Sequence, residues 1–238
     1  DILVVNEDMV HDLKRVPMFE NAYNFGMQST NPETLRLSGR KAGVEMFGKK
    51  IPLIRKIDPK AEFSFDLLYG LPGDNFHHFR ETTDFALSLH PRKLYFSNLL
   101  LLPGTPYWTD KEKHGFEYVD GFPYLVSGNS TYSISDMEKT RDFAIWVMFV
   151  LYVHTIKETI HKMVALNPKL KHVDLIDRLA DLIKREFDPI EGVDLNVLTL
   201  EGNNFARRRV FNRFAEPENC HIAYKACGEL LKEYNMDH

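Results

Sequence analysis

The stretch that decides the fold is FSFDLLYGLPGD, residues 63–74. Its aromatic and aliphatic side chains favour a buried strand, and the glycines and proline that follow require a tight turn. Asp66 interrupts this apolar run, although an unpaired buried carboxylate would cost several kcal/mol. We therefore expect Asp66 either to face a pocket or to make a structural hydrogen bond to a neighbouring loop.

A similar strand, turn and helix precede this stretch. AYNFGM at residues 22–27 predicts a strand, and a helix follows that begins at Pro32 with Asn31 as its N-cap. The polar turn at residues 28–31 can bind ribose hydroxyls or a carboxylate, or it can merely cap the helix. Arg40, farther along, can project toward such a pocket or into water.

A third strand is expected at residues 93–102, where it stops at PGTP, and a helix over 75–89 connects it to the second. Alternating strands and helices predict a parallel sheet. In such sheets the ligand site lies beyond the carboxyl ends of the strands. The three turns should therefore share one pocket.

The pattern changes to long helices after residue 125, which predicts two domains, 1–125 and 126–238. Ser135 and Glu138 form a capping box at the start of the first of these helices. The apolar run at 143–153 is shorter than the ~20 residues that span a bilayer, so we interpret it as a buried core helix. Residues 115–133 are expected to be a linker or a packed lid.

Composition narrows the class of protein. The chain has 238 residues, 44% hydrophobic and 27% charged, which is typical of a globular protein. Its net charge of -4 offers no general attraction for nucleic acid or acidic membranes. Two cysteines and the lack of a signal peptide favour a cytoplasmic setting. Because Asp1 is not methionine and a strand is expected already at residues 2–5, we expect a fragment of a longer protein.

Other clusters have simpler interpretations. His77 and His78 are neighbours whose side chains diverge, so a surface pair is favoured over a metal site. Cys220 and Cys227 share a helix face and are expected to be inert thiols, since no further ligands lie at a recognisable spacing. The basic and aromatic residues of segment 205–214 can bind nucleic acid or form a solvated helix face, and the latter is favoured.

Three motifs together resemble the radical S-adenosylmethionine (SAM) superfamily: FGMQSTNPETL at 25–35, DLLYGLPGD at 66–74 and LLLPGTP at 100–106. They are similar to strands four, five and six of its partial barrel. The resemblance implies an α/β fold, the C-terminal part of a (βα)6 partial TIM-type barrel followed by an all-α domain. The most similar subgroup is that of cobalamin-binding-domain radical SAM proteins, or Fe-S oxidoreductases, which are similar to magnesium-protoporphyrin monomethyl ester cyclase.

The resemblance also implies roles for individual residues. Contacts with SAM are implied for Gln28, Ser29, Arg40, Tyr69, Gly70, Leu71, Leu102 and Pro103. Among these, Gln28 and Ser29 would lie near the ribose and methionine groups, and Arg40 would meet the carboxylate. Asp66 would point into the barrel as a candidate catalytic residue.

The cofactors implied are SAM, a 4Fe-4S cluster and, in the most similar subgroup, cobalamin. The cluster needs a CxxxCxxC loop, which this chain lacks, so no metal ligand is assigned here and the fragment alone should be inactive. The parent would be an oxidoreductase or methyltransferase. Expected partners are a small-molecule or peptide substrate and upstream domains, with no nucleic acid or membrane. The alternative is a non-catalytic docking module on a half-barrel scaffold.

Overall fold

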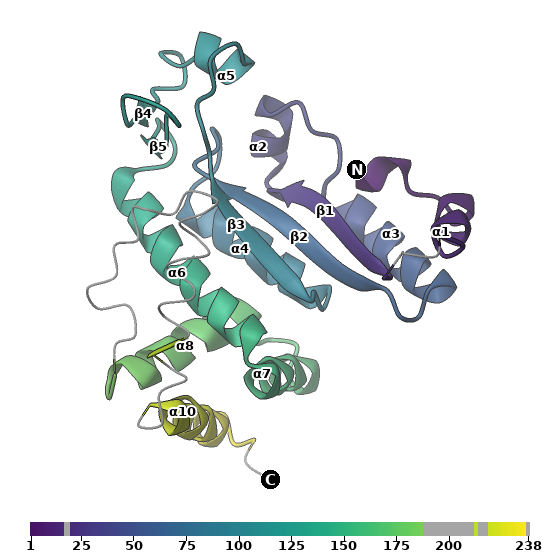
Figure 1. Cartoon of the computed structure of the whole chain (residues 1–238). Helices are drawn as coiled ribbons and strands as arrows, with labels where there is room; N and C mark the ends of the chain where they lie inside the picture. The colour runs from purple at the N-terminus through teal and green to yellow at the C-terminus, as the bar shows by residue number, and fades with distance from the viewer. Residues whose placement is uncertain (17–19, 188–211, 214–218, 237–238) are drawn as a thin grey trace. The chain divides into compact units, whose positions relative to one another are not determined.

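The computed structural model describes residues 1–16, 20–187, 212–213 and 219–236. They form two compact units, residues 1–140 and 141–238, which divide later in the chain than the boundary expected after residue 125. Figure 1 shows the elements in space, coloured by position along the chain. The first unit contains η1 (Ile2–Val4), α1 (Glu7–Leu13), β1 (Ala22–Gln28), α2 (Pro32–Leu37), α3 (Val44–Ile57), β2 (Glu62–Tyr69), α4 (Phe76–Ser88), β3 (Lys93–Asn98), α5 (Pro106–Thr109), β4 (Glu117–Tyr118) and β5 (Val126–Gly128).

The three predicted strands form one parallel sheet in the order β1-β2-β3. Helices α3 and α4 lie behind it in Figure 1. Phe47 of α3 meets Phe65 edge-on, with ring centroids 5.8 Å apart, and Phe79 of α4 lies 5.9 Å from Tyr69. The chain is therefore mixed α/β, and an aromatic core joins the helices to one face of the sheet.

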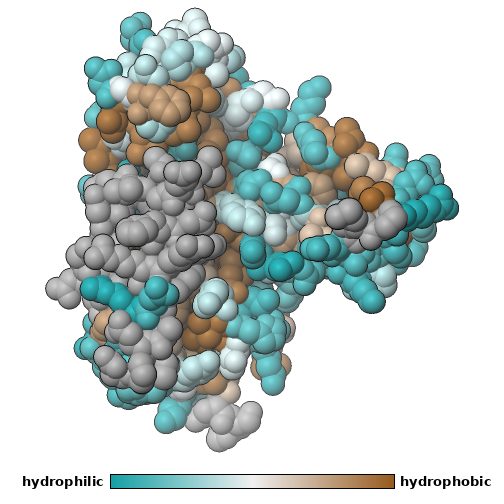
Figure 2. Space-filling view, viewed as in Figure 1, coloured by the Kyte–Doolittle hydropathy of each residue, from teal (hydrophilic) through white to brown (hydrophobic). Residues whose placement is uncertain are grey.

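The opposite face of the sheet is polar. Asn24, Ser64, Asp66 and Tyr95 alternate with the core side chains and are half-buried or exposed. Figure 2 shows hydrophilic residues over this side of the strands. Parallel sheets normally bury both faces in the core. The polar, open face of this sheet is therefore available for a role other than core packing.

The end of the third strand differs from the expectation. β3 ends at Asn98 instead of continuing to residue 102, because residues 99–101 bend away and pair antiparallel with 124–126. The buried amide of Asn98 donates to the carbonyl of Val126 at 3.0 Å, a structural role. The segment expected as linker or lid is thus packed against the sheet.

Two local predictions are wrong. The apolar start forms η1 and not a strand, and Asp1 caps it. Helix α6 (Ile134–Tyr152) is capped by Ser133, whose hydroxyl accepts from the N–H of Asp136 at 3.1 Å, so the capping box at Ser135 is not used. The N-cap prediction for Asn31 is confirmed, since its side chain accepts from Thr34 at 3.0 Å.

The second unit is helical. It holds the later part of α6 with α7 (His154–Leu166), α8 (His172–Lys184) and α10 (Cys220–Glu233). The expected core helix is confirmed by Phe143, Val147 and Phe149, which are at most 3% exposed. Among the described residues no single helix is long and apolar enough to span a membrane; α6 and α7 meet those criteria only as a pair bent by 101°.

Candidate functional site

The candidate site begins where β1 ends. Gly26 pairs with Asp66 of β2, but Gln28 pairs with Leu67, so a bulge interrupts the register between Gly26 and Gln28. Gln28 has a φ of +67°, a left-handed conformation that few non-glycine residues adopt. Backbone strain of this kind clusters at functional sites.

Gln28 and Arg40 converge over Gly26. A β-carbon on Gly26 would lie 2.9 Å from Nε2 of Gln28 and 3.7 Å from Nη1 of Arg40. Arg40 is exposed and donates a long hydrogen bond of 3.4 Å to the carbonyl of Gly26. The two predicted ligand contacts thus lie together and present amide and guanidinium N–H groups, which suit a carboxylate.

Tyr107 of α5 lies close to Arg40 and Ser38. Burial raises the pKa of the Tyr107 phenol, while the hydroxyl of Ser38 and the positive charge of Arg40 oppose that rise. The segment after β3 therefore places the aromatic side chain of Tyr107 near the Arg40 guanidinium, which lies beside the end of β1.

Asp66 lies half-buried on the polar face of β2. Its carboxylate accepts from Nδ2 of Asn24 at 3.3 Å. Desolvation raises the pKa of Asp66, and the hydrogen bond from Asn24 opposes the rise. The side chain thus meets a partner on the neighbouring strand instead of a loop, and its predicted contact with a ligand stays a prediction.

Ser29 is placed differently from Gln28. It is 1% exposed, its hydroxyl donates to Oδ2 of Asp74 at 3.0 Å, and it accepts from the N–H of Asn31 at 3.1 Å. Nearby, Thr30 contacts Thr82 of α4 through its N–H and its hydroxyl. Ser29 therefore holds two strand-end loops together, and its predicted contact with a ligand stays a prediction.

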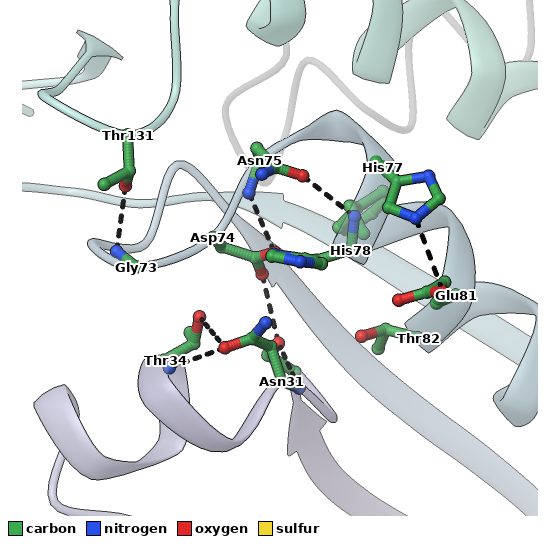
Figure 3. Close-up of polar contacts among 12 residues, drawn as sticks. Asn31, Thr34, Gly73, Asp74, Asn75, His77, His78, Glu81, Thr82 and Thr131 are labelled. Carbon is green, nitrogen blue, oxygen red and sulfur yellow. Dashed lines mark hydrogen bonds and ion pairs between the residues drawn. The ribbon is translucent and has the colours of Figure 1, made fainter.

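Asp74 is the centre of this loop network (Figure 3). It is fully buried, accepts from the N–H of Asn75 at 2.9 Å, and lies 3.9 Å from Nδ1 of His78. Burial raises the pKa of Asp74 to about 6, although Asn75, Ser29 and His78 all favour its ionised form. The two neighbouring histidines diverge as predicted, since His77 turns to Glu81.

The turn after β2 is tightly packed. Tyr69 is 1% exposed and packs on the helix-covered face, and Leu71 is 2% exposed. Gly70 has a φ of +82°, its carbonyl accepts from Asn129 at 2.9 Å, and a β-carbon there would lie 3.0 Å from Cε of Met137. Any contact of this turn with a ligand would have to use backbone atoms.

Leu102 and Pro103, the predicted contacts after the third strand, lie in an exposed turn. Leu102 is 41% exposed, and its carbonyl accepts from the hydroxyl of Thr105 at 2.7 Å. That same hydroxyl caps α5 by accepting from Trp108.

No group of three or more metal-binding side chains occurs in the part of the chain that the structure describes. Cys227 is buried, and burial raises the pKa of its thiol, as expected of an inert cysteine. His161 and His172 pair in the second unit at 3.1 Å. The aromatic and arginine residues of the basic segment lie outside the described residues, except Arg213.

Sequence reasoning missed Gly26, Asp74 and Tyr107. The sequence places Asp74 in a turn, where an acid is ordinarily exposed, and no local pattern signals its burial. One signal in the sequence was available, the adjacent polar residues Gln28 and Ser29. Because successive side chains of a strand point to opposite faces, the two must point to opposite sides of the sheet.

Comparison with known proteins adds a second line of evidence. No protein-family model matches the chain. Over 102 residues it is 26% identical to a threonylcarbamoyladenosine tRNA methylthiotransferase of Thermotoga maritima, covering 43% of this chain and 24% of that protein. Over 104 residues it is 27% identical to a tRNA-2-methylthio-N(6)-dimethylallyladenosine synthase of Acinetobacter baylyi, covering 44% and 22%. These similarities support a relation to the radical SAM superfamily.

A third relative, the tRNA-2-methylthio-N(6)-dimethylallyladenosine synthase of Buchnera aphidicola, is 29% identical over 85 residues, covering 36% of this chain and 20% of its own. The chain thus matches no more than 24% of the length of these radical SAM relatives. By their names they are enzymes.

Proposed function

We propose that this chain is part of a radical SAM enzyme and that the end of β1 forms one wall of its SAM site. The observation that carries the proposal is the convergence of Gln28 and Arg40 over Gly26, beside the open polar face of the sheet. A guanidinium is well suited to bind a carboxylate, and SAM carries one. The similarity to methylthiotransferases supports the same assignment.

In this proposal each side chain has a limited task. Arg40 binds the carboxylate of SAM, and Gln28 donates its amide to the same ligand. Asp66, held by Asn24, accepts from a donor on SAM or substrate. The turn at residues 70–71 flanks the adenine and the backbone of Leu102 and Pro103 meets its edge, with the sheet as half of a partial barrel.

A 4Fe-4S cluster, when bound in such enzymes, supplies the electron for reductive cleavage of SAM. The residues of this chain do not fit the cluster, because its two cysteines are fewer than the three required. We therefore propose that a CxxxCxxC segment elsewhere in the parent protein holds it. Cobalamin, implied only by the resemblance to one subgroup, has no part in this proposal.

The substrate is proposed separately from the cofactor. The relatives are named for modification of adenosine in tRNA, whereas the net charge of -4 gives this chain no general attraction for nucleic acid. We propose that the substrate is a small molecule or a peptide. We also propose that the protein works in a reducing, cytoplasmic setting.

The test uses the full-length protein, reconstituted anaerobically with iron and sulfide and then mixed with SAM and dithionite. We expect 5′-deoxyadenosine to form, as measured by liquid chromatography. If the cluster forms but no 5′-deoxyadenosine appears, the proposal fails and the alternative of a non-catalytic docking module is favoured. A reading frame without CxxxCxxC ahead of Asp1 would contradict the proposal in the same way.

A further inference from the structure

Gly26 stands at the point where β1 leaves its regular register. It is still paired with Asp66 of β2, and the bulge follows immediately. Among the glycines that the structure describes, six have a positive φ, but Gly26 is not one of them, so its backbone conformation suits an ordinary L residue. The backbone conformation therefore does not require glycine at this position, and the reason for a glycine lies elsewhere.

That cause is the space above Gly26. The amide of Gln28 folds back along the strand until its Nε2 lies 2.9 Å from the position of a β-carbon on Gly26, closer than real β-carbons approach other atoms. Nη1 of Arg40 lies 3.7 Å from the same position, an ordinary contact distance. A methyl group would displace the Gln28 amide first and leave Arg40 nearly in place.

We infer that Gly26 is a positioning residue, whose missing side chain lets the Gln28 amide lie beside the Arg40 guanidinium as one pair of donors for a carboxylate. The inference rests on the proposed SAM site. A substitution at Gly26 should change the affinity for the ligand without lowering the stability of the fold, because the displaced atoms are the end of a flexible side chain and not backbone. Few glycine substitutions are expected to change only the affinity for a ligand.

The experiment measures the affinity for SAM by calorimetry in the full-length, cluster-loaded protein. Gly26→Ala should bind SAM about tenfold more weakly, the effect of losing one hydrogen bond to a charged group. Its thermal midpoint should be unchanged or higher, because alanine restricts the unfolded chain. The matched control is Gly48→Ala on α3, where a β-carbon meets nothing within 4 Å and the affinity should not change.

A double-mutant cycle identifies the cause. If Gly26 acts through Gln28, then Gly26→Ala should have little further effect on affinity in a Gln28→Ala background. Equal affinity of Gly26→Ala and wild type would overturn the inference, as would an equal loss of affinity or of thermal stability in both backgrounds. If the wild type itself does not bind SAM, the proposed function has failed instead.

Discussion

Replacing Asp74 by asparagine tests how the strand-end loops are held together. Burial raises the pKa of Asp74 to about 6 in the folded chain, whereas an unfolded aspartate titrates near 3.9. Between about pH 4 and pH 6 the folded chain therefore binds more protons than the unfolded chain, and its free energy of unfolding falls as the pH rises. Because asparagine cannot ionise, position 74 causes no such fall in the free energy of unfolding of the asparagine variant.

The magnitude follows from the shift. About two pKa units, at about 1.4 kcal/mol each, correspond to about 3 kcal/mol. Relative to wild type, the free energy of unfolding of Asp74→Asn should thus rise by about 2 kcal/mol between pH 4 and pH 7, with the rest of the change below pH 4, and stay level above pH 7. A lost hydrogen bond to Ser29 or Asn75 would add only an offset that does not vary with pH.

The assay is urea unfolding at a series of pH values. The two tryptophans, Trp108 and Trp146, fall one in each compact unit, so a Trp146→Phe background makes fluorescence report the unit that holds Asp74. Asp120→Asn in an exposed loop is the matched control and should show no such rise. A difference between Asp74→Asn and wild type that is constant from pH 4 to pH 7 would refute the reasoning.

Three further substitutions test the packing. Phe79→Ala should lower the free energy of unfolding by about 3–5 kcal/mol, because it empties the aromatic core under the sheet, and a loss below 1 kcal/mol in urea would contradict this. Gly70→Ala should cost more than about 1 kcal/mol, since its φ is +82° and Met137 fills the space beside it; an unchanged thermal midpoint would count against the account. Arg178→Ala removes a bidentate ion pair with Glu233 and should lower the thermal midpoint only slightly, by an amount that decreases with added salt; a large drop would contradict this.

The three strands of the sheet could be predicted because their signals are local. Residues 63–74 contain both the apolar run and the turn that ends it, and the N-cap at Asn31 lies directly before Pro32. The polar position of Asp66 follows from alternation along a strand. The same alternation places Gln28 and Ser29 on different sides, so only one of the two could meet a ligand from the sheet face.

The remaining features depend on contacts distant in sequence. Helix α3 carries Pro52 in its interior, which argues against a helix on local grounds, yet Phe47 and Ile51 are 0% exposed and packing outweighs the proline. The burial of Asp74 depends on Ser29, 45 positions away. The space above Gly26 depends on the left-handed conformation of Gln28, which no sequence pattern encodes.

The central claim, that the end of β1 binds SAM, is tested most directly by one titration. Arg40→Ala and Arg36→Ala are compared with wild type for SAM affinity in the full-length, cluster-loaded protein. Arg36 is already paired with Glu33 through two hydrogen bonds, whereas Arg40 is exposed beside Gln28. We predict a loss of about tenfold or more for Arg40→Ala and none for Arg36→Ala, since a hydrogen bond to a charged group contributes about 1.5–3 kcal/mol. Equal affinity of Arg40→Ala and wild type would contradict the account.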